Sequence, residues 1–218
     1  MEKYLKLYRQ SIVAGCFVTI TTFISIYARY LIGGDLGLIL SYILFPIGFV
    51  FIEFTNSKLF TNCMYNLEIK LKEIFVIYLG NLIGCVFSTF FLLPIEFSMN
   101  GLIKYIGRVS TMQFSHTRIF FLEAIICEFC VLLGIYFAKN QFKDTLFGRI
   151  FVIWLTTFMF NFLGLSHCVV ILFYHIINIF ITRQYILSGV FAIIFSMFGC
   201  IVGSIIFQNF LEVEDGQD

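Results

Sequence analysis

The sequence predicts an all-α membrane protein. Of its 218 residues, 60% are hydrophobic and 12% are charged, whereas soluble domains are about half apolar and about a quarter charged. The mean hydropathy is +0.97. One helical crossing of a bilayer takes roughly 20 residues, so the chain has room for about six spans with short loops. No soluble catalytic domain fits beside them, and we expect no enzyme.

Charge and cysteine usage exclude other classes. The formal net charge is only +1, and without a long basic run we expect no nucleic-acid partner. Seven cysteines lie in or beside apolar runs, which is typical of small buried side chains. Cys127 and Cys130 have C-x-x-C spacing, but they lie in mid-helix without a second pair or suitably placed histidines. We therefore predict neither a metal site nor a cofactor.

Polar and glycine-containing interruptions divide the apolar sequence. Two short segments, 57–67 and 167–182, each follow a longer segment after such an interruption, and neither is long enough to span alone. We interpret each short piece and its predecessor as one broken helix, which gives six spans with the second and fifth broken. The apolar segments run over residues 11–31, 35–54, 57–67, 74–97, 117–138, 145–163, 167–182 and 186–210.

The two halves of the chain resemble each other. Gly80 to Cys85 in the third span has a counterpart in Phe195 to Cys200 in the sixth. Because three spans are an odd number, the second copy enters the membrane in the opposite sense, which is an inverted repeat. The alternative is a chance likeness between apolar helices. We predict one transmembrane domain, with a polar N-terminus at 1–10, repeats at 11–100 and 117–210, and an acidic tail at 211–218.

Basic residues set the expected orientation. A cytoplasmic N-terminus places more lysine and arginine inside than outside, as the positive-inside rule requires. The C-terminal tail is then cytoplasmic too, and we expect a multi-pass protein of the cell membrane. The inside set is Lys3, Lys6, Arg9, Lys70, Lys72, Lys139, Lys143 and Arg149, and the outside set is Arg29, Lys104, Arg108, Arg118 and Arg183.

The helix breaks are the candidate functional site. Half-helices begin near Leu59 and His167, and their free amide groups favour an anion at mid-depth. An imidazole at the second break could exchange a proton with a weak-acid anion near neutral pH. The alternative is a histidine that only holds the helix bundle together. We expect such a structural or interfacial role for His175 and His116.

Four stretches resemble the formate/nitrite transporter family. Lys58-Leu59-Phe60-Thr61-Asn62 is similar to the family's acidic-Leu-Phe-Thr pattern, and Gly164-Leu165-Ser166-His167 to its Gly-Phe-Glu-His stretch. The run Gly80-Asn81-x-x-Gly84 and the segment Ala124 to Glu128 fall where the family has similar stretches in its third and fourth spans. The resemblance covers about Ser11 to Phe210 and identifies the chain as a divergent member.

The resemblance implies an aquaporin-like protomer in a homopentamer. Family members pass small monovalent anions such as formate, nitrite, hydrosulfide or lactate, often with a proton, so the expected partners are such a solute and the lipid bilayer. By position, His167 is the central histidine and Thr61 its hydroxyl partner. The implied apolar constrictions comprise Phe45, Leu59, Phe60 and Phe160.

Departures from the family pattern leave the substrate open. Lys58 replaces the acidic residue before Leu-Phe-Thr, and Ser166 replaces the glutamate before the central histidine. Glu128 aligns with an asparagine of the fourth span. The family's outer lysine aligns at Met112 or Gln113, which leaves Arg118 as the nearest cation.

Intramembrane charges are candidates for function because an unpaired charge in the bilayer is costly. Glu53, Glu123 and Glu128 qualify, and we treat Lys58, Glu128 and Arg118 as candidate pore charges. Glu128 is a candidate partner for Lys58 across the pore. The alternative is a protonated glutamate that is hydrogen-bonded to the backbone.

The sequence therefore favours a channel or transporter for small weak-acid anions, proton-linked through His167. Two alternatives stay open: a channel for a small neutral solute, and a transport-inactive membrane scaffold.

Overall fold

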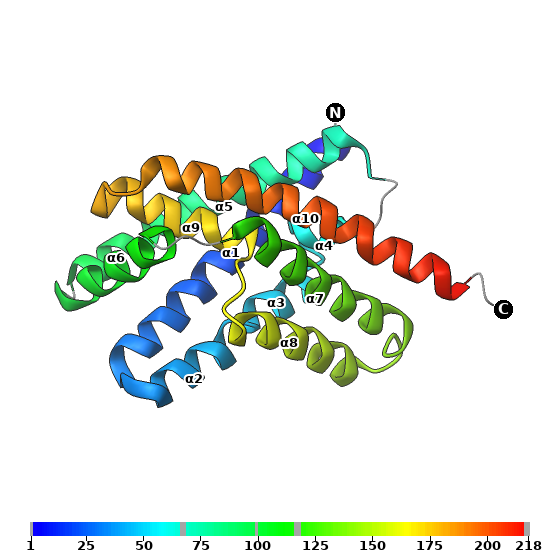
Figure 1. Cartoon of the computed structure of the whole chain (residues 1–218), viewed down its shortest axis with the longest axis horizontal. Helices are drawn as coiled ribbons and strands as arrows, with labels where there is room; N and C mark the ends of the chain where they lie inside the picture. The colour runs from blue at the N-terminus through cyan, green and yellow to red at the C-terminus, as the bar shows by residue number, and fades with distance from the viewer. Residues whose placement is uncertain (1, 66–68, 99, 116–118, 216–218) are drawn as a thin grey trace.

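A computed structural model describes residues 2–65, 69–98, 100–115 and 119–215, and every regular element within these ranges is helical (Figure 1). The first half contains α1 (Glu2–Ile32), α2 (Gly34–Leu44), α3 (Ile47–Phe54), α4 (Phe60–Cys63) and α5 (Leu71–Ser98). After α6 (Asn100–Ser115) come α7 (Phe120–Asn140), α8 (Leu146–Phe162), α9 (Cys168–Ile177), a π-helical turn η1 (Asn178–Thr182) and α10 (Ile186–Asp215).

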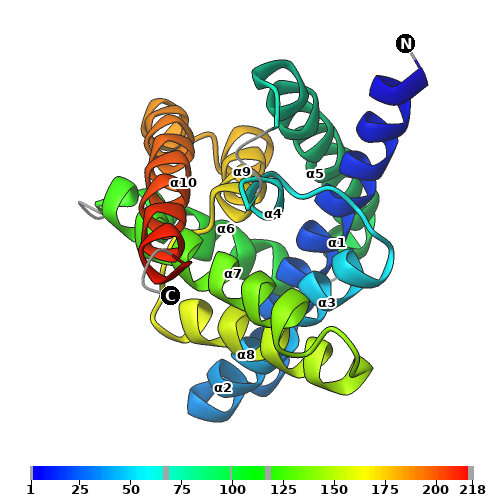
Figure 2. The same cartoon turned by 90° about the vertical axis from the view of Figure 1, so that its right-hand side faces the viewer.

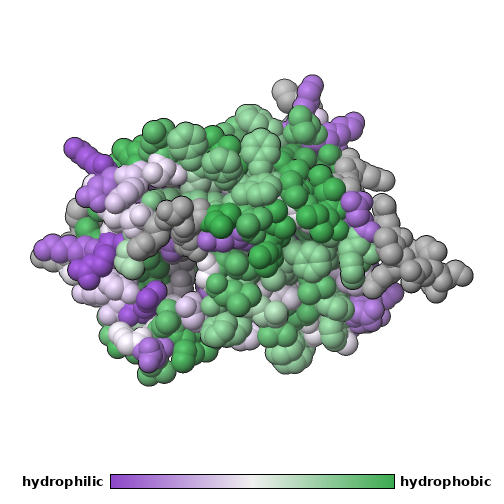
Figure 3. Space-filling model, viewed as in Figure 1, coloured by the Kyte–Doolittle hydropathy of each residue, from purple (hydrophilic) through white to green (hydrophobic). Residues whose placement is uncertain are grey.

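The helices are long and apolar enough for a bilayer. Within the described ranges, five reach that length: α1, α2 with α3, α5, α7 and α10. The apolar helices α8 and α9 with η1 are shorter. Helices suit this setting because they satisfy their own backbone hydrogen bonds in lipid. Figure 3 shows apolar side chains over the middle of the visible face and hydrophilic groups toward both of its ends, and together with the long apolar helices this identifies an integral membrane protein.

Polar ends of the molecule lie far apart. The starts of α1 and α5, the turn between α7 and α8, and the end of α10 lie at one end (Figure 1). There Lys3 Nζ lies 2.6 Å from Glu73 Oε1. The α1–α2 turn, α6 and the start of α10 lie at the opposite end.

The sequence did not predict α6. This helix connects the two halves, and its buried Leu102 and Ile106 pack against Phe173 and Ile177 of α9. Lys104 and Arg108 interrupt its apolar sequence, so it lacks the continuous hydrophobic run that marks a span. Its fold follows from an amphipathic pattern with one buried face.

Close helix packing occurs at matching places in the two halves. Helix α1 packs against α5, and α7 packs against α10. A Cβ on Gly80 would lie 2.5 Å from Ser11 Cβ, and one on Gly84 would collide with the Ile12 carbonyl oxygen. In the second half, a Cβ on Gly199 would lie 2.5 Å from the Phe121 oxygen. Small residues allow membrane helices to approach this closely.

Two non-helical segments interrupt the bundle. Helix α3 ends at Phe54 and α4 begins at Phe60, while α8 ends at Phe162 and α9 begins at Cys168. Each segment contains a residue with positive φ, Asn56 at 50° and Gly164 at 68°. Such residues let the chain leave a right-handed helix abruptly. The two segments meet where Thr61 Oγ1 lies 3.3 Å from His167 Nε2, and Figure 2 shows α4 and α9 near the centre of the bundle.

Candidate functional site

Thr61 and His167 meet where the two interruptions face each other. Thr61 Oγ1 lies 3.3 Å from His167 Nε2, although 106 residues separate them in sequence. Both side chains are buried, with exposed fractions of 0% and 2%. Thr61 belongs to α4, and His167 is the N-cap of α9. The tertiary structure therefore brings the predicted histidine and hydroxyl together.

The second ring nitrogen of His167 determines the direction of this hydrogen bond. Val169 N–H donates to His167 Nδ1 over 3.3 Å. In a neutral imidazole one nitrogen accepts and the other carries the hydrogen, so Nε2–H donates to Thr61. The Thr61 hydroxyl in turn donates to Asn62 Oδ1 at 3.5 Å, near the limit for such a bond. A directed chain of donors thus runs from His167 through Thr61 to Asn62.

The amide groups at the two half-helices are not all free, which corrects the expectation from the sequence. Phe60 N–H donates to Asn81 Oδ1 at 2.9 Å, and Val169 N–H donates to His167 Nδ1. Helix α4 also spans only 4 residues, too few peptide units to sum to a sizeable dipole. The helix ends therefore contribute less to anion binding than the sequence suggested.

Asn81 holds the first interruption in place. Its side chain is fully buried, and its Nδ2 donates to the carbonyl oxygens of Ser11 at 2.8 Å and Lys58 at 3.0 Å. One amide thereby links α1, α5 and the segment before Thr61. The sequence reasoning noted Asn81 only as part of a family-like run. One feature of the sequence indicates such a role for Asn81: it is a lone amide side chain inside a long apolar helix, where a polar group without a hydrogen-bond partner is costly.

Aromatic rings surround the imidazole of His167. Phe160 stacks on it with ring centroids 5.7 Å apart, and Phe49 meets it edge-on at 5.1 Å. Phe45 packs against Phe160 at 6.0 Å. The sequence reasoning named Phe45 and Phe160 but missed Phe49, because one more phenylalanine in a phenylalanine-rich helix is not distinctive. The result is an apolar wall beside the histidine.

The other two predicted constriction residues directly precede Thr61 in the chain and line neither cavity. Leu59 and Phe60 are both buried, with exposed fractions of 0% and 1%. The ring of Phe60 packs edge-on against Tyr78 at 5.2 Å. Both side chains contribute to the apolar core next to Thr61.

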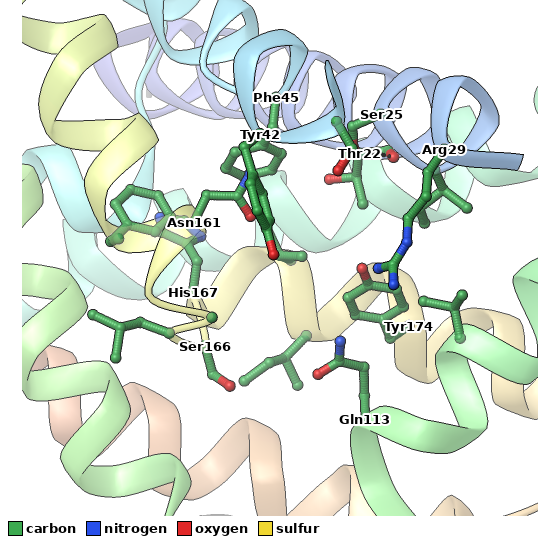
Figure 4. A pocket seen from close by; sticks show the side chains of 18 residues that line it. Thr22, Ser25, Arg29, Tyr42, Phe45, Gln113, Asn161, Ser166, His167 and Tyr174 are labelled. Atoms are coloured by element: carbon green, nitrogen blue, oxygen red, sulfur yellow. Dashed lines mark hydrogen bonds between the residues drawn. The ribbon is translucent and has the colours of Figure 1, made fainter. Parts of the chain in front are cut away.

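A cavity of about 280 Å³ opens toward the end that carries α6, and we call it the Arg29 pocket. His167, Ser166, Phe45 and Phe160 are among its lining residues. Figure 4 shows Arg29 extending into it from α1, beside the ring of Tyr174. The histidine lies at the inner limit of this cavity.

A second cavity of about 480 Å³ lies toward the end that carries the N-terminus, and we call it the Lys58 pocket. Its lining includes Asn62, which receives the hydrogen bond from Thr61. Lys58 and Lys139 line it together with Glu53 and Glu73, so it contains charges of both signs. The donor chain from His167 to Asn62 connects the two cavities.

The predicted charges occupy different surroundings. Glu128 has an exposed fraction of 0%, and its Oε1 accepts a hydrogen bond from Ser204 at 3.1 Å. It lines neither cavity, and it forms no ion pair with Lys58. Arg118 and His116 lie outside the described residues.

Glu123 contacts the second interruption from α7. Its Oε2 accepts a hydrogen bond from the Ser166 hydroxyl. This contact places the Glu123 carboxylate against the residue that directly precedes His167. Among the described residues, no cluster of three or more histidine, cysteine or acidic side chains is arranged to hold a metal ion.

Fold and site together define a helical membrane protein in which one cavity ends at a buried histidine and a second cavity begins beyond Thr61, at Asn62. The sequence profile of the formate/nitrite transporter family matches residues 2–213, so the chain belongs to this family of anion channels and transporters. Among curated protein sequences, none matches significantly.

Solved structures have the same fold. A pentameric formate channel with formate bound superposes with a TM-score of 0.84 at 19% identity, covering 100% of this chain and 99% of that one. An ion channel of the same family superposes with a TM-score of 0.77, also at 19% identity, covering 93% and 87% of the two chains.

Proposed function

We propose that this protein moves small monovalent weak-acid anions, such as formate or nitrite, across a membrane together with a proton. The path runs from the Arg29 pocket past Phe45 and Phe160 to His167 and Thr61, and then to the Lys58 pocket. The observation that carries the proposal is the donor chain from His167 through Thr61 to Asn62, because it joins the two cavities.

The barrier in this path explains why a proton is needed. A bare anion loses its hydration beside the aromatic wall, and that transfer costs far more than transfer of a neutral molecule. An imidazole that has first taken up a proton from an aqueous cavity can turn Nε2–H from Thr61 to an arriving anion and transfer one proton to it. The neutral acid then passes the apolar stretch and leaves a neutral imidazole, which takes up the next proton from the aqueous cavities.

The same proposal includes a six-span inverted repeat with broken second and fifth helices. Two observations support it: glycines on α5 and α10 that pack against α1 and α7, and left-handed residues at Asn56 and Gly164 in the two interruptions. We further propose a homopentamer with both termini in the cytoplasm. Support comes from the pentameric relative and from the termini lying at one end. We also propose Lys58, in the segment between α3 and α4, as a charge of the pore.

The decisive experiment measures formate uptake into proteoliposomes as a function of external pH. We expect uptake to rise as the pH falls, because protonation limits passage. His167→Ala should reduce the rate by at least tenfold and remove the pH dependence. Thr61→Ser, which keeps the hydroxyl, should retain activity, while Thr61→Val should lose most of it. The matched control is His175→Gln, since His175 lies outside both cavities and packs at Gly189.

Three outcomes would contradict the proposal. Uptake that His167→Ala leaves unchanged would exclude the assigned proton role. Osmotic swelling by a neutral solute, without pH dependence, would favour the neutral-solute channel. Absence of flux for every small solute, with the oligomer intact, would favour the scaffold.

A further inference from the structure

Arg29 dominates the electrostatics of the pocket that leads to His167. Among the described residues that line this pocket, Arg29 is the one side chain with a permanent charge. It forms no ion pair with any described residue. Figure 4 shows its guanidinium group directed into the cavity. An arginine in this position keeps its donors available for a ligand.

Three hydroxyl groups that line the pocket from α1 and α2 donate their hydrogens to backbone oxygens of their own helices. Thr22 donates to the Val18 oxygen at 2.7 Å, and Ser25 donates to the Thr22 oxygen at 2.8 Å. Ser41 donates to the Leu38 oxygen at 2.7 Å. These three side chains therefore present acceptor oxygens to the cavity, which repel an anion. Among the described lining residues, the guanidinium group is the one donor with a permanent positive charge that an anion meets there.

The opposite pocket lacks this arrangement. In the Lys58 pocket, Lys58 and Lys139 are accompanied by Glu53 and Glu73. Lys139 Nζ also lies 4.5 Å from the centre of the Tyr65 ring. Neighbouring acidic groups and this cation–π contact weaken the attraction of either lysine for an anion. The two mouths of the path thus differ in their affinity for anions.

We infer that Arg29 is the capture and selectivity residue, and that it favours planar anions with two oxygens, such as carboxylates or nitrite, over spherical anions. This inference rests on the proposed function and names the substrate class of the same path. The guanidinium fork donates two parallel hydrogen bonds to a carboxylate, which a spherical anion cannot receive in the same way. A lysine supplies the charge without the fork.

Formate uptake by three variants tests the inference. Arg29→Gln should raise the KM for formate roughly tenfold and leave the maximal rate within about twofold, since a tenfold change corresponds to about 1.4 kcal/mol of binding. Arg29→Lys should raise the KM by about threefold, because the charge remains but the fork is lost. The control is Arg108→Gln, on α6 at the same end, which lines a separate groove and should change the KM by less than twofold.

A binding measurement separates this inference from the proposed function. At low ionic strength, formate should raise the thermal unfolding midpoint of the detergent-solubilised wild type more than chloride does. The difference should vanish in Arg29→Gln and Arg29→Lys. If the wild type shows this difference and the Arg29 variants lose it, but the wild type takes up no solute, the transport proposal is refuted and anion capture by Arg29 is supported. Equal stabilisation by formate and chloride, or equal KM values for Arg29→Gln and Arg108→Gln, would overturn the inference.

Discussion

Asn81 determines the conformation around Thr61 through three hydrogen bonds. It accepts from Phe60 N–H and donates to the carbonyl oxygens of Ser11 and Lys58. Each buried group that loses its partner costs about 1–3 kcal/mol. The side chain is small, but it links α1 to both sides of the segment that precedes Thr61.

We therefore expect Asn81→Ala to destabilise the protein by several kcal/mol, since three buried groups lose a partner at about 1–3 kcal/mol each. Asn81→Asp should also destabilise it, because a carboxylate accepts from Phe60 N–H but cannot donate to the two carbonyl oxygens. The measurement is thermal unfolding followed with a thiol-reactive dye. Four free thiols are buried and become accessible to the dye only when the bundle opens: Cys85, Cys127, Cys168 and Cys200.

The control for this prediction lies on the same helix. Thr89 is equally buried, but its hydroxyl donates to the Cys85 oxygen one turn away. Thr89→Val should lower the unfolding midpoint much less than Asn81→Ala. Equal effects would mean that loss of any polar group on α5, rather than support of the interruption, causes the destabilisation.

Helix packing is governed at the level of elements by glycines on α5 and α10. A Cβ on Gly84 would collide with the Ile12 carbonyl oxygen of α1, and a Cβ on Gly203 would lie 2.8 Å from the Ile125 oxygen of α7. Both obstacles are backbone atoms of a packed helix, so they cannot rotate away. The helices themselves have to separate.

Gly84→Ala and Gly203→Ala should each lower stability by about 1–3 kcal/mol, as expected for overpacking. Gly107→Ala on α6 is the control, since its Cβ would approach the Thr182 methyl carbon at 3.1 Å, a side-chain atom that can move. Unfolding midpoints of the three purified variants check the prediction. Tolerance of Ala at both Gly84 and Gly203 would contradict the close packing of these helix pairs.

At the scale of the whole molecule, large apolar side chains are exposed around the outside. Phe147, Leu187 and Leu36 are exposed to 78%, 69% and 68%. Apolar surface of this extent belongs against lipid or against neighbouring protomers. The phenylalanine-rich composition thus serves the exterior as well as the aromatic wall beside His167.

We expect native mass spectrometry of the protein in mild detergent to give five times the 25.3 kDa protomer mass. The reason is that a pentameric relative shares the fold along the full length of the chain. A monomer or dimer that still transports formate would contradict the pentamer. Crosslinking in native membranes before extraction tests whether detergent has dissociated the assembly.

Local features of the chain are predictable from its sequence. Hydropathy alone predicted the helical membrane class, and the polar and glycine-containing interruptions predicted the end of α3 and the start of α9 closely. These features are local, because a bilayer span and a helix break depend on neighbouring residues in the chain. The family resemblance, which the sequence profile confirms, likewise follows from local motifs.

Contacts between distant segments were decided by the tertiary structure. Sequence could not show that Val169 N–H donates to His167 Nδ1, or that Asn81 accepts a hydrogen bond from Phe60 N–H in the first interruption. It also could not show that Glu128 accepts a hydrogen bond from Ser204 instead of pairing with Lys58. Nor could it assign Arg29 to the pocket before His167. The sequence by itself determined the helical membrane class and its apolar segments, because burial in lipid acts on each segment separately. Only the tertiary structure decided which polar groups meet, because hydrogen bonds and ion pairs depend on distances of a few ångströms between segments far apart in the chain.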